Sequence, residues 1–189
     1  MKKRRIAIVA FLLCACMVIG MGYAAVSKNL DVLGTVNVSN SALNVVFTND
    51  SAPAEVEDNC CTNVTVLDGA VQARMTTSVM SEKGQQAVAV LVIENKMTDT
   101  DVSITHLDHS FTGALSEDYF TVTRAFAAVN ADDGVEFGVD DENMPIVTKL
   151  PAQKSVKLTI TITLNQELTQ TLSGDRCEFT GQFLATAIN

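Results

Sequence analysis

Apolar and polar residues alternate along most of this chain, and that alternation constrains its fold more than any other feature. In Ser155–Leu164, every second position is Val, Leu or Ile, and Ser, Thr or Lys fills the positions between. A period of two separates side chains onto the two faces of a β-strand, whereas an amphipathic helix repeats every 3.6 residues. About eight or nine short segments of this kind, joined by polar turns, predict an all-β antiparallel β-sandwich.

The most apolar of these segments is Gln86–Glu94, which we expect to be a central, well-buried strand. Asn95–Thr100 has turn composition, so we expect this strand to form a hairpin with Val102–Leu107. Ala52–Thr62 and Asn130–Asn143 are polar or acidic and are predicted loops. The other predicted strands are residues 30–38, 43–47, 63–67, 73–80, 119–126, 155–164 and 177–188.

The first 24 residues have the layout of a secretory signal peptide. Four basic residues, Lys2–Arg5, precede an unbroken apolar run, Ile6–Met21, and small residues follow that would allow cleavage after Ala24. Residues 25–189 then form one domain, long enough for a single core. Two alternatives stay open: the apolar run is retained as a membrane anchor, or a lipid is attached to Cys16. We expect a secreted, extracellular or cell-surface protein that meets a signal peptidase during export.

The net charge of the exported domain limits the classes of partner that we expect it to bind. The whole chain has a formal charge of −9, and the signal holds four of its 13 basic residues, leaving nine basic against 22 acidic residues. The resulting net charge of −13 repels nucleic acid and anionic lipid, so we expect neither. Contact with a membrane is expected only through an uncleaved signal. Self-association, or association with related secreted proteins, is the partner class that remains.

Three cysteines follow the signal, and an odd number leaves at least one thiol unpaired in an oxidising compartment. Neighbouring Cys60 and Cys61 could bond each other only through a strained ring. We therefore expect a disulfide from Cys60 or Cys61 to Cys177, with the leftover thiol free or linking two chains. The alternative is that all three thiols are unpaired.

The chain has two histidines, His106 and His109, and both are weak candidates for metal ligands. Their spacing of three residues points them to opposite faces of a regular strand. A bend after Leu107 would bring them together, with Asp108 or Asp118 as a third ligand.

A second weak metal candidate is the acidic loop that contains Asp132 and Asp133, whose carboxylates could bind Ca²⁺. The loop does not match the EF-hand pattern, and a solvated acidic loop is the favoured interpretation. The sequence also lacks a nucleophile elbow, a phosphate-binding loop and a dinucleotide fingerprint. We expect no catalytic residue and no cofactor.

Three segments together resemble the TasA/camelysin-like secreted proteins of Gram-positive bacteria. They are Gly22-Tyr23-Ala24 ahead of an alternating strand, the strand and turn within Val88–Val102, and the Pro-Ala-Gln-Lys lead into a Thr-rich strand in Pro151–Leu164. The resemblance implies a jelly-roll-like sandwich, export with a dedicated signal peptidase, and assembly into extracellular or biofilm matrix fibres. In such fibres the N-terminal strand of one subunit completes the sheet of the next. Some relatives are described as metallopeptidases.

These observations favour a non-enzymatic secreted structural protein of the cell surface or extracellular matrix. If it assembles by N-terminal strand addition, the residues that would face a neighbour are Leu30, Val32, Val36 and Val38. In the isolated molecule we expect the same strand to pair within its own chain. The alternative function is a monomeric extracellular binding or adhesion module, and a metallopeptidase is the least favoured.

Overall fold

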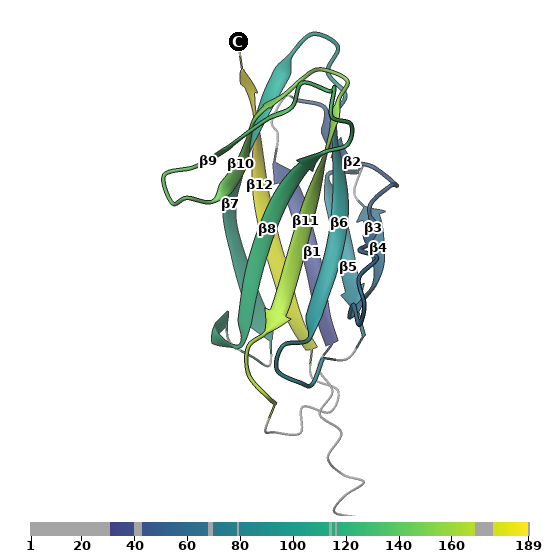
Figure 1. The fold of residues 1–189 in the computed structure, drawn as a ribbon, viewed down its shortest axis with the longest axis vertical. Coiled ribbons are helices and arrows are strands. Elements are labelled where there is room, and N and C mark those ends of the chain that lie inside the picture. Colours follow the sequence, from purple (N-terminus) through teal and green to yellow (C-terminus); the bar gives the residue numbers. More distant parts are fainter. Residues whose placement is uncertain are drawn as a thin grey trace, which may run out of the picture.

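The chain folds into two β-sheets packed face to face, as the alternating pattern predicted (Figure 1). The computed structural model describes residues 31–39, 43–67, 70–78, 80–113, 115, 117–168 and 176–188. The predicted signal peptide of residues 1–24, its cleavage site at Ala24, and Leu30 lie outside the described residues. Within the described part, no helix is long and apolar enough to span a bilayer.

The larger sheet has seven strands, and all but one of its neighbouring pairs are antiparallel. The exception joins the first and the last described strands, β1 and β12, which run parallel. In spatial order the strands are β4 (Cys61–Leu67), β5 (Gln72–Thr77), β1 (Asp31–Ser39), β12 (Arg176–Ile188), β7 (Asp101–Gly113), β10 (Pro145–Leu150) and β9 (Glu136–Val139).

The smaller sheet has five strands and is antiparallel. It contains, in order, β2 (Val45–Phe47), β6 (Gln86–Asn95), β11 (Ser155–Leu164) and β8 (Phe120–Ala128), with β3 (Ala52–Pro53) also paired to β6. In Figure 1, β8, β11 and β6 cross in front of β12 and β1 of the larger sheet. A short 3-10 helix, η2 (Glu117–Tyr119), leads into β8.

The core lies between the two sheets and is built from the apolar positions of the alternating strands. β11 contributes all five of its apolar side chains, each at most 1 % exposed, while its Thr and Lys side chains face outward. Burying a Leu, Ile or Phe side chain stabilises the fold by about 1.5–3 kcal/mol. The largest fully buried side chains are Phe47, Phe179, Phe183, Met80, Leu91, Ile93, Ile104, Leu150, Leu158, Ile160 and Ile162.

The expected hairpin between Gln86–Glu94 and Val102–Leu107 does not form. β6 belongs to the smaller sheet and β7 to the larger one, so the connection at Asn95–Thr100 crosses between the sheets. The partners of β6 are β2, β3 and β11, and those of β7 are β10 and β12. The turn composition predicted a reversal of direction correctly, but turn residues do not specify which sheet the next strand joins.

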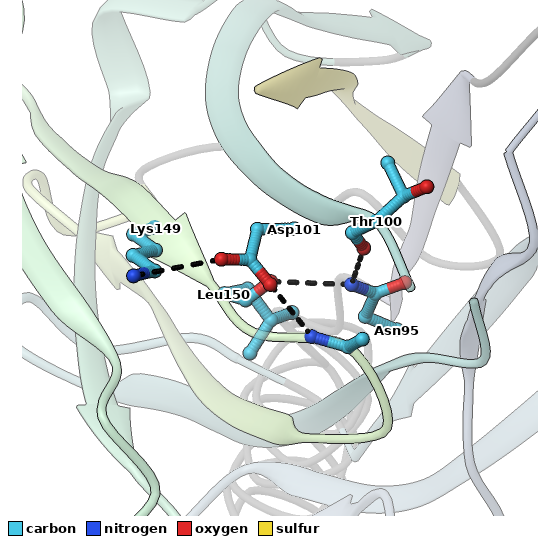
Figure 2. Close-up of polar contacts among 6 residues, drawn as sticks. Asn95, Thr100, Asp101, Lys149 and Leu150 are labelled. Atoms are coloured by element: carbon cyan, nitrogen blue, oxygen red, sulfur yellow. Dashed lines mark hydrogen bonds and ion pairs between the residues drawn. The ribbon is translucent and has the colours of Figure 1, made fainter. Parts of the chain in front are cut away.

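Asn95 holds this crossing in place from a fully buried position (Figure 2). Its side-chain amide donates to the carbonyl of Thr100 over 2.9 Å and to that of Leu150 over 3.1 Å. Its Oδ1 accepts from the backbone N–H of Met97. Next to it, Asp101 accepts from the backbone N–H of Ala152 and pairs with a lysine of β10. These contacts join the end of β6 to the opposite sheet.

The structure holds more strands than the eight or nine expected. The predicted loop Ala52–Thr62 contains the short β3, the predicted loop Asn130–Asn143 contains β9, and a further strand, β10, follows it. β9 is only four residues long and is an edge strand, so its alternation is too short to detect. Its Gly138 lies against β10, where an added Cβ would be 2.8 Å from Cγ2 of Thr148.

Candidate functional site

A β-bulge in β7 brings the two histidines to the same face of the strand. Where β7 pairs with β12, Asp108 is opposite Gln182 and His106 is opposite Phe183. Leu107, between Asp108 and His106, is therefore an extra residue in β7. Leu107 is 50 % exposed, while both histidines are partly buried. The ring centroids of His106 and His109 are 5.7 Å apart. The regular-strand expectation of opposite faces therefore fails, and the bend after Leu107 considered as its alternative is present.

Arg124 lies at an inward-facing position of β8, opposite these histidines. It alternates with Phe120, Val122 and Phe126 and is only 8 % exposed. Burial lowers the pKa of both His106 and His109, and the nearby positive charge of Arg124 lowers each pKa further. The guanidinium and the two imidazoles thus form one polar layer between the sheets, which we call the Arg124 layer (Arg124, His106 and His109).

Aromatic pairs lie on both sides of the Arg124 layer. On one side, the rings of Phe111 and Phe120 are stacked with centroids 4.6 Å apart. On the other side, Phe183 makes edge contacts with Phe126 at 6.2 Å and with His106 at 5.5 Å. The polar layer is therefore enclosed by apolar rings, where charges interact more strongly than in water.

The acidic residues near the layer interact with His109 rather than with Arg124. Glu117 of η2 forms an ion pair with His109, with 3.2 Å between Oε1 and Nε2. Asp108 accepts a hydrogen bond from the backbone N–H of His109 over 2.7 Å. Burial lowers the pKa of Arg124, and the more distant charge of Asp108 offsets this only in part.

Three buried side-chain nitrogen atoms among the described residues lack a hydrogen-bond partner, and all three belong to the Arg124 layer. They are Nε2 of His106 and Nε and Nη2 of Arg124. Leaving such groups unsatisfied costs about 1–3 kcal/mol each, and more where the group is charged. The layer therefore carries a cost of burial that no described side chain offsets with a hydrogen bond.

The Arg124 layer lies on the side of the sandwich where two strand edges are unpaired. β8 pairs with β11 along one edge, and no described strand pairs with its other edge. β7 pairs with β12 along its length, while β10 matches it only at Val102 and Ile104. After Ile104, the edge of β7 that faces away from β12 has no described partner strand.

The other metal candidates do not join the histidines. Among the described residues, no group of three or more His, Cys, Asp or Glu side chains is arranged to hold a metal ion. Asp133 accepts from Nζ of Lys154 over 2.9 Å and from the side chain of Asn130, and these contacts lower its pKa. Asp132 is exposed. The positive charge of Arg124 makes the histidine pair a poor site for a cation.

The expected disulfide is not formed in this structure. Cys60, Cys61 and Cys177 are free and buried. Cys61 is on β4 and Cys177 on β12, and β5 and β1 lie between them in the sheet. Three strand spacings correspond to about 14 Å, well beyond the 7 Å limit for Cα atoms joined by a disulfide.

The strand proposed for addition to a neighbour is paired inside its own chain, as expected for the isolated molecule. Val32, Val36 and Val38 lie on β1, whose backbone pairs with β12 on one side and β5 on the other. β1 is therefore an internal strand of the larger sheet rather than an edge.

Sequence reasoning missed Arg124. The signal was present, since Arg124 stands where the alternation of the predicted strand 119–126 calls for an apolar residue.

In comparisons with known proteins, no family model matches this chain and no curated protein is significantly similar to it.

Proposed function

We propose that this protein is an exported, non-enzymatic structural subunit of the cell surface or extracellular matrix, which self-associates by exchanging β1 between copies. The observation that carries the proposal is the position of β1. It is the first described strand, yet it fills the interior of the larger sheet between β5 and β12. A strand that lies early in the chain and is central in the sheet can be supplied by another copy with the same hydrogen bonds.

The two neighbours of β1 are distant from it in sequence. β1 is parallel to β12 from Asp31 opposite Arg176 to Ser39 opposite Leu184, and antiparallel to β5 from Leu33 to Asn37. Without β1, β5 and β12 would both expose unpaired backbone groups inside the sheet, which is a strong template for an incoming strand. This supports assembly by exchange over assembly by surface contact alone.

The position of Gly34 supports a single register for the exchanged strand. A Cβ added to Gly34 would lie 2.6 Å from Cε and 3.2 Å from Cβ of Met75. Only glycine therefore fits opposite Met75 without movement, and a shift by one residue would bring a side chain into this position. Register selection of this kind would give an exchanged strand specificity.

Export is supported by the signal-like residues 1–24, and the absence of an enzymatic role is inferred from the sequence, which lacks recognisable catalytic motifs. The strongly acidic remainder of the chain favours solubility of the exported subunit before it assembles.

Cysteine cross-linking tests the exchange directly. Thr35 of β1 is opposite Thr180 of β12, and the spacing of paired strands suits a disulfide. In polymers of a T35C/T180C variant, oxidation should join neighbouring subunits into a ladder on a non-reducing gel. A matched control is T123C/T161C, a facing pair on β8 and β11 that exchange of β1 leaves within one chain.

Removal of the strand gives a second arm. A variant lacking residues 25–38 should form no polymers by electron microscopy or sedimentation. A synthetic peptide of residues 25–39 added to it should restore β-sheet circular dichroism without restoring polymers. Polymers formed by the deletion variant, or cross-links confined within single subunits in polymers of the T35C/T180C variant, would contradict the proposal.

A monomeric extracellular binding module is the second candidate, and the Arg124 layer favours it because that layer contains unsatisfied donors beside an open edge. It predicts a stable monomer by sedimentation at every concentration.

A further inference from the structure

The positive charge of Arg124 has no hydrogen-bonded counter-anion among the described residues. Nε and Nη2 of Arg124 are buried without a partner, in a residue that is 8 % exposed. The nearest carboxylates are engaged elsewhere, since Glu117 pairs with His109 and Asp108 binds a backbone N–H. Because a buried, unpaired guanidinium is strongly unfavourable, a counter-anion at this position would remove a large cost.

We infer that Arg124 and His106 form a binding site for a carboxylate that enters between the unpaired edges of β7 and β8. A guanidinium presents its N–H groups in a planar fork that matches the two oxygens of a carboxylate. The neighbouring Phe rings make the surroundings less polar than water, which strengthens a pairing between charges. This inference does not depend on the proposed exchange of β1.

His106 makes the site sensitive to protons. Nε2 of its ring is buried without a partner, and in the neutral ring that carries its proton on Nδ1 this atom is an acceptor. Protonation turns Nε2 into a second donor for the carboxylate. The charged and titratable groups that act on His106 are His109 and Asp108 on β7 and Arg124 on β8, while Glu117 of η2 pairs with His109. Binding then takes up a proton, and affinity rises as the pH falls from 7.5 to 5.5.

Two sources of carboxylate share this chemistry: a free small acid, and an acidic side chain on an extended peptide. The probes are sodium acetate and a short extended peptide with one Glu, compared with sodium phosphate and with sodium chloride at equal ionic strength. The measurements are the Tm of the purified full-length protein and its histidine ring NMR signals. The chain contains two histidines, so each signal can be followed alone.

We expect acetate to shift the His106 signals and to raise Tm by roughly 5 °C at about 100 times its Kd. R124Q should lose both responses, and R124K, which keeps the charge without the fork, should bind at least about tenfold more weakly. H106N should bind acetate with little dependence on pH. R74Q removes an exposed arginine of β5 and should respond as wild type.

A response to the peptide at concentrations where acetate has no effect would assign the carboxylate to a bound strand. A response to phosphate alone would overturn the assignment to carboxylate. Equal Tm values in acetate, peptide and chloride with unmoved histidine signals would overturn the site, and this result needs no variant to fold. An R124Q protein that responds as wild type would also overturn it.

Discussion

The side-chain amide of Asn95 donates a hydrogen bond to the carbonyl of Leu150 over 3.1 Å, and so joins the last residue of β6 to β10 in the opposite sheet. The same amide binds Thr100, at the far end of the crossing. One buried side chain therefore satisfies backbone groups on both sides of the connection between the sheets (Figure 2).

Asn95→Ala should destabilise the fold by about 2 kcal/mol or more, because it removes the hydrogen bonds to the buried carbonyl of Leu150, the partly buried carbonyl of Thr100 and the Met97 N–H. Urea unfolding followed by circular dichroism measures the change. Asn44→Ala, at an exposed position, is the control and should stay within about 0.5 kcal/mol of wild type. Equal stability of the two variants would show that the corner does not depend on Asn95.

Stability should fall as the pH drops below about 6.5, because burial and Arg124 hold the pKa values of His106 and His109 below their usual 6.5 in the folded protein. The unfolded chain then binds more protons than the folded one between the folded pKa values and 6.5. The contribution of the two histidines to the stability of the fold is complete above pH 6.5. It is lost as the pH falls through their pKa values in the folded protein. Denaturant unfolding between pH 7.5 and 5.5 measures this slope.

The H106N/H109N double variant should flatten that slope, since neither asparagine takes up a proton. Carboxylates titrate mainly at lower pH and should leave this window little changed. A double variant with the same slope as wild type would assign the pH dependence to other groups.

Gly34→Ala should destabilise the fold by about 1–3 kcal/mol, because the new Cβ would overlap the Met75 side chain. Met75→Ala removes the overlapping atoms but leaves a cavity, which has its own cost. The cost of Gly34→Ala should therefore be smaller in the Met75→Ala background. A double-mutant cycle from chemical unfolding measures the difference, and additive costs would show that the two residues do not couple.

The three thiols should resist modification while the protein is folded. Burial raises the pKa of all three cysteines, that of Cys61 to about 11, so at pH 8 little reactive thiolate forms. Iodoacetamide should label the peptides that contain Cys60, Cys61 and Cys177 only after denaturation. Mass spectrometry of non-reduced digests should find no peptide linked to Cys177, and such a linked peptide would restore the expected disulfide.

The alternation of the chain predicted the sandwich because it directly encodes which side chains are buried, as in β11. Two features depended on partners distant in sequence and could not be predicted locally. The crossing after Asn95 depends on the carbonyl of Leu150, and the bulge at Leu107 depends on the register of β7 against Gln182 and Phe183. Both are decided by tertiary pairing.

The candidate site could be predicted only in part. The sequence predicts a bend after Leu107 as one alternative, but it indicates a carboxylate rather than an arginine as the partner of the histidines. Arg124 stands at an apolar position of its strand, and a buried arginine there is a stronger indication of a site than two histidines near a strand end. That Arg124 lies opposite His106 and His109 of β7 follows only from the packing of the two sheets.

The parallel pairing of β1 with β12 also has a consequence for how the chain folds. Residues 31–39 and 176–184 must meet, so the larger sheet cannot be completed until residues 176–184 have been synthesised. Contacts between such distant segments slow folding, because a long loop must close before they stabilise anything. A growing chain that lacks β12 therefore leaves β1 and β7 without their shared neighbour, and its larger sheet stays incompletely folded.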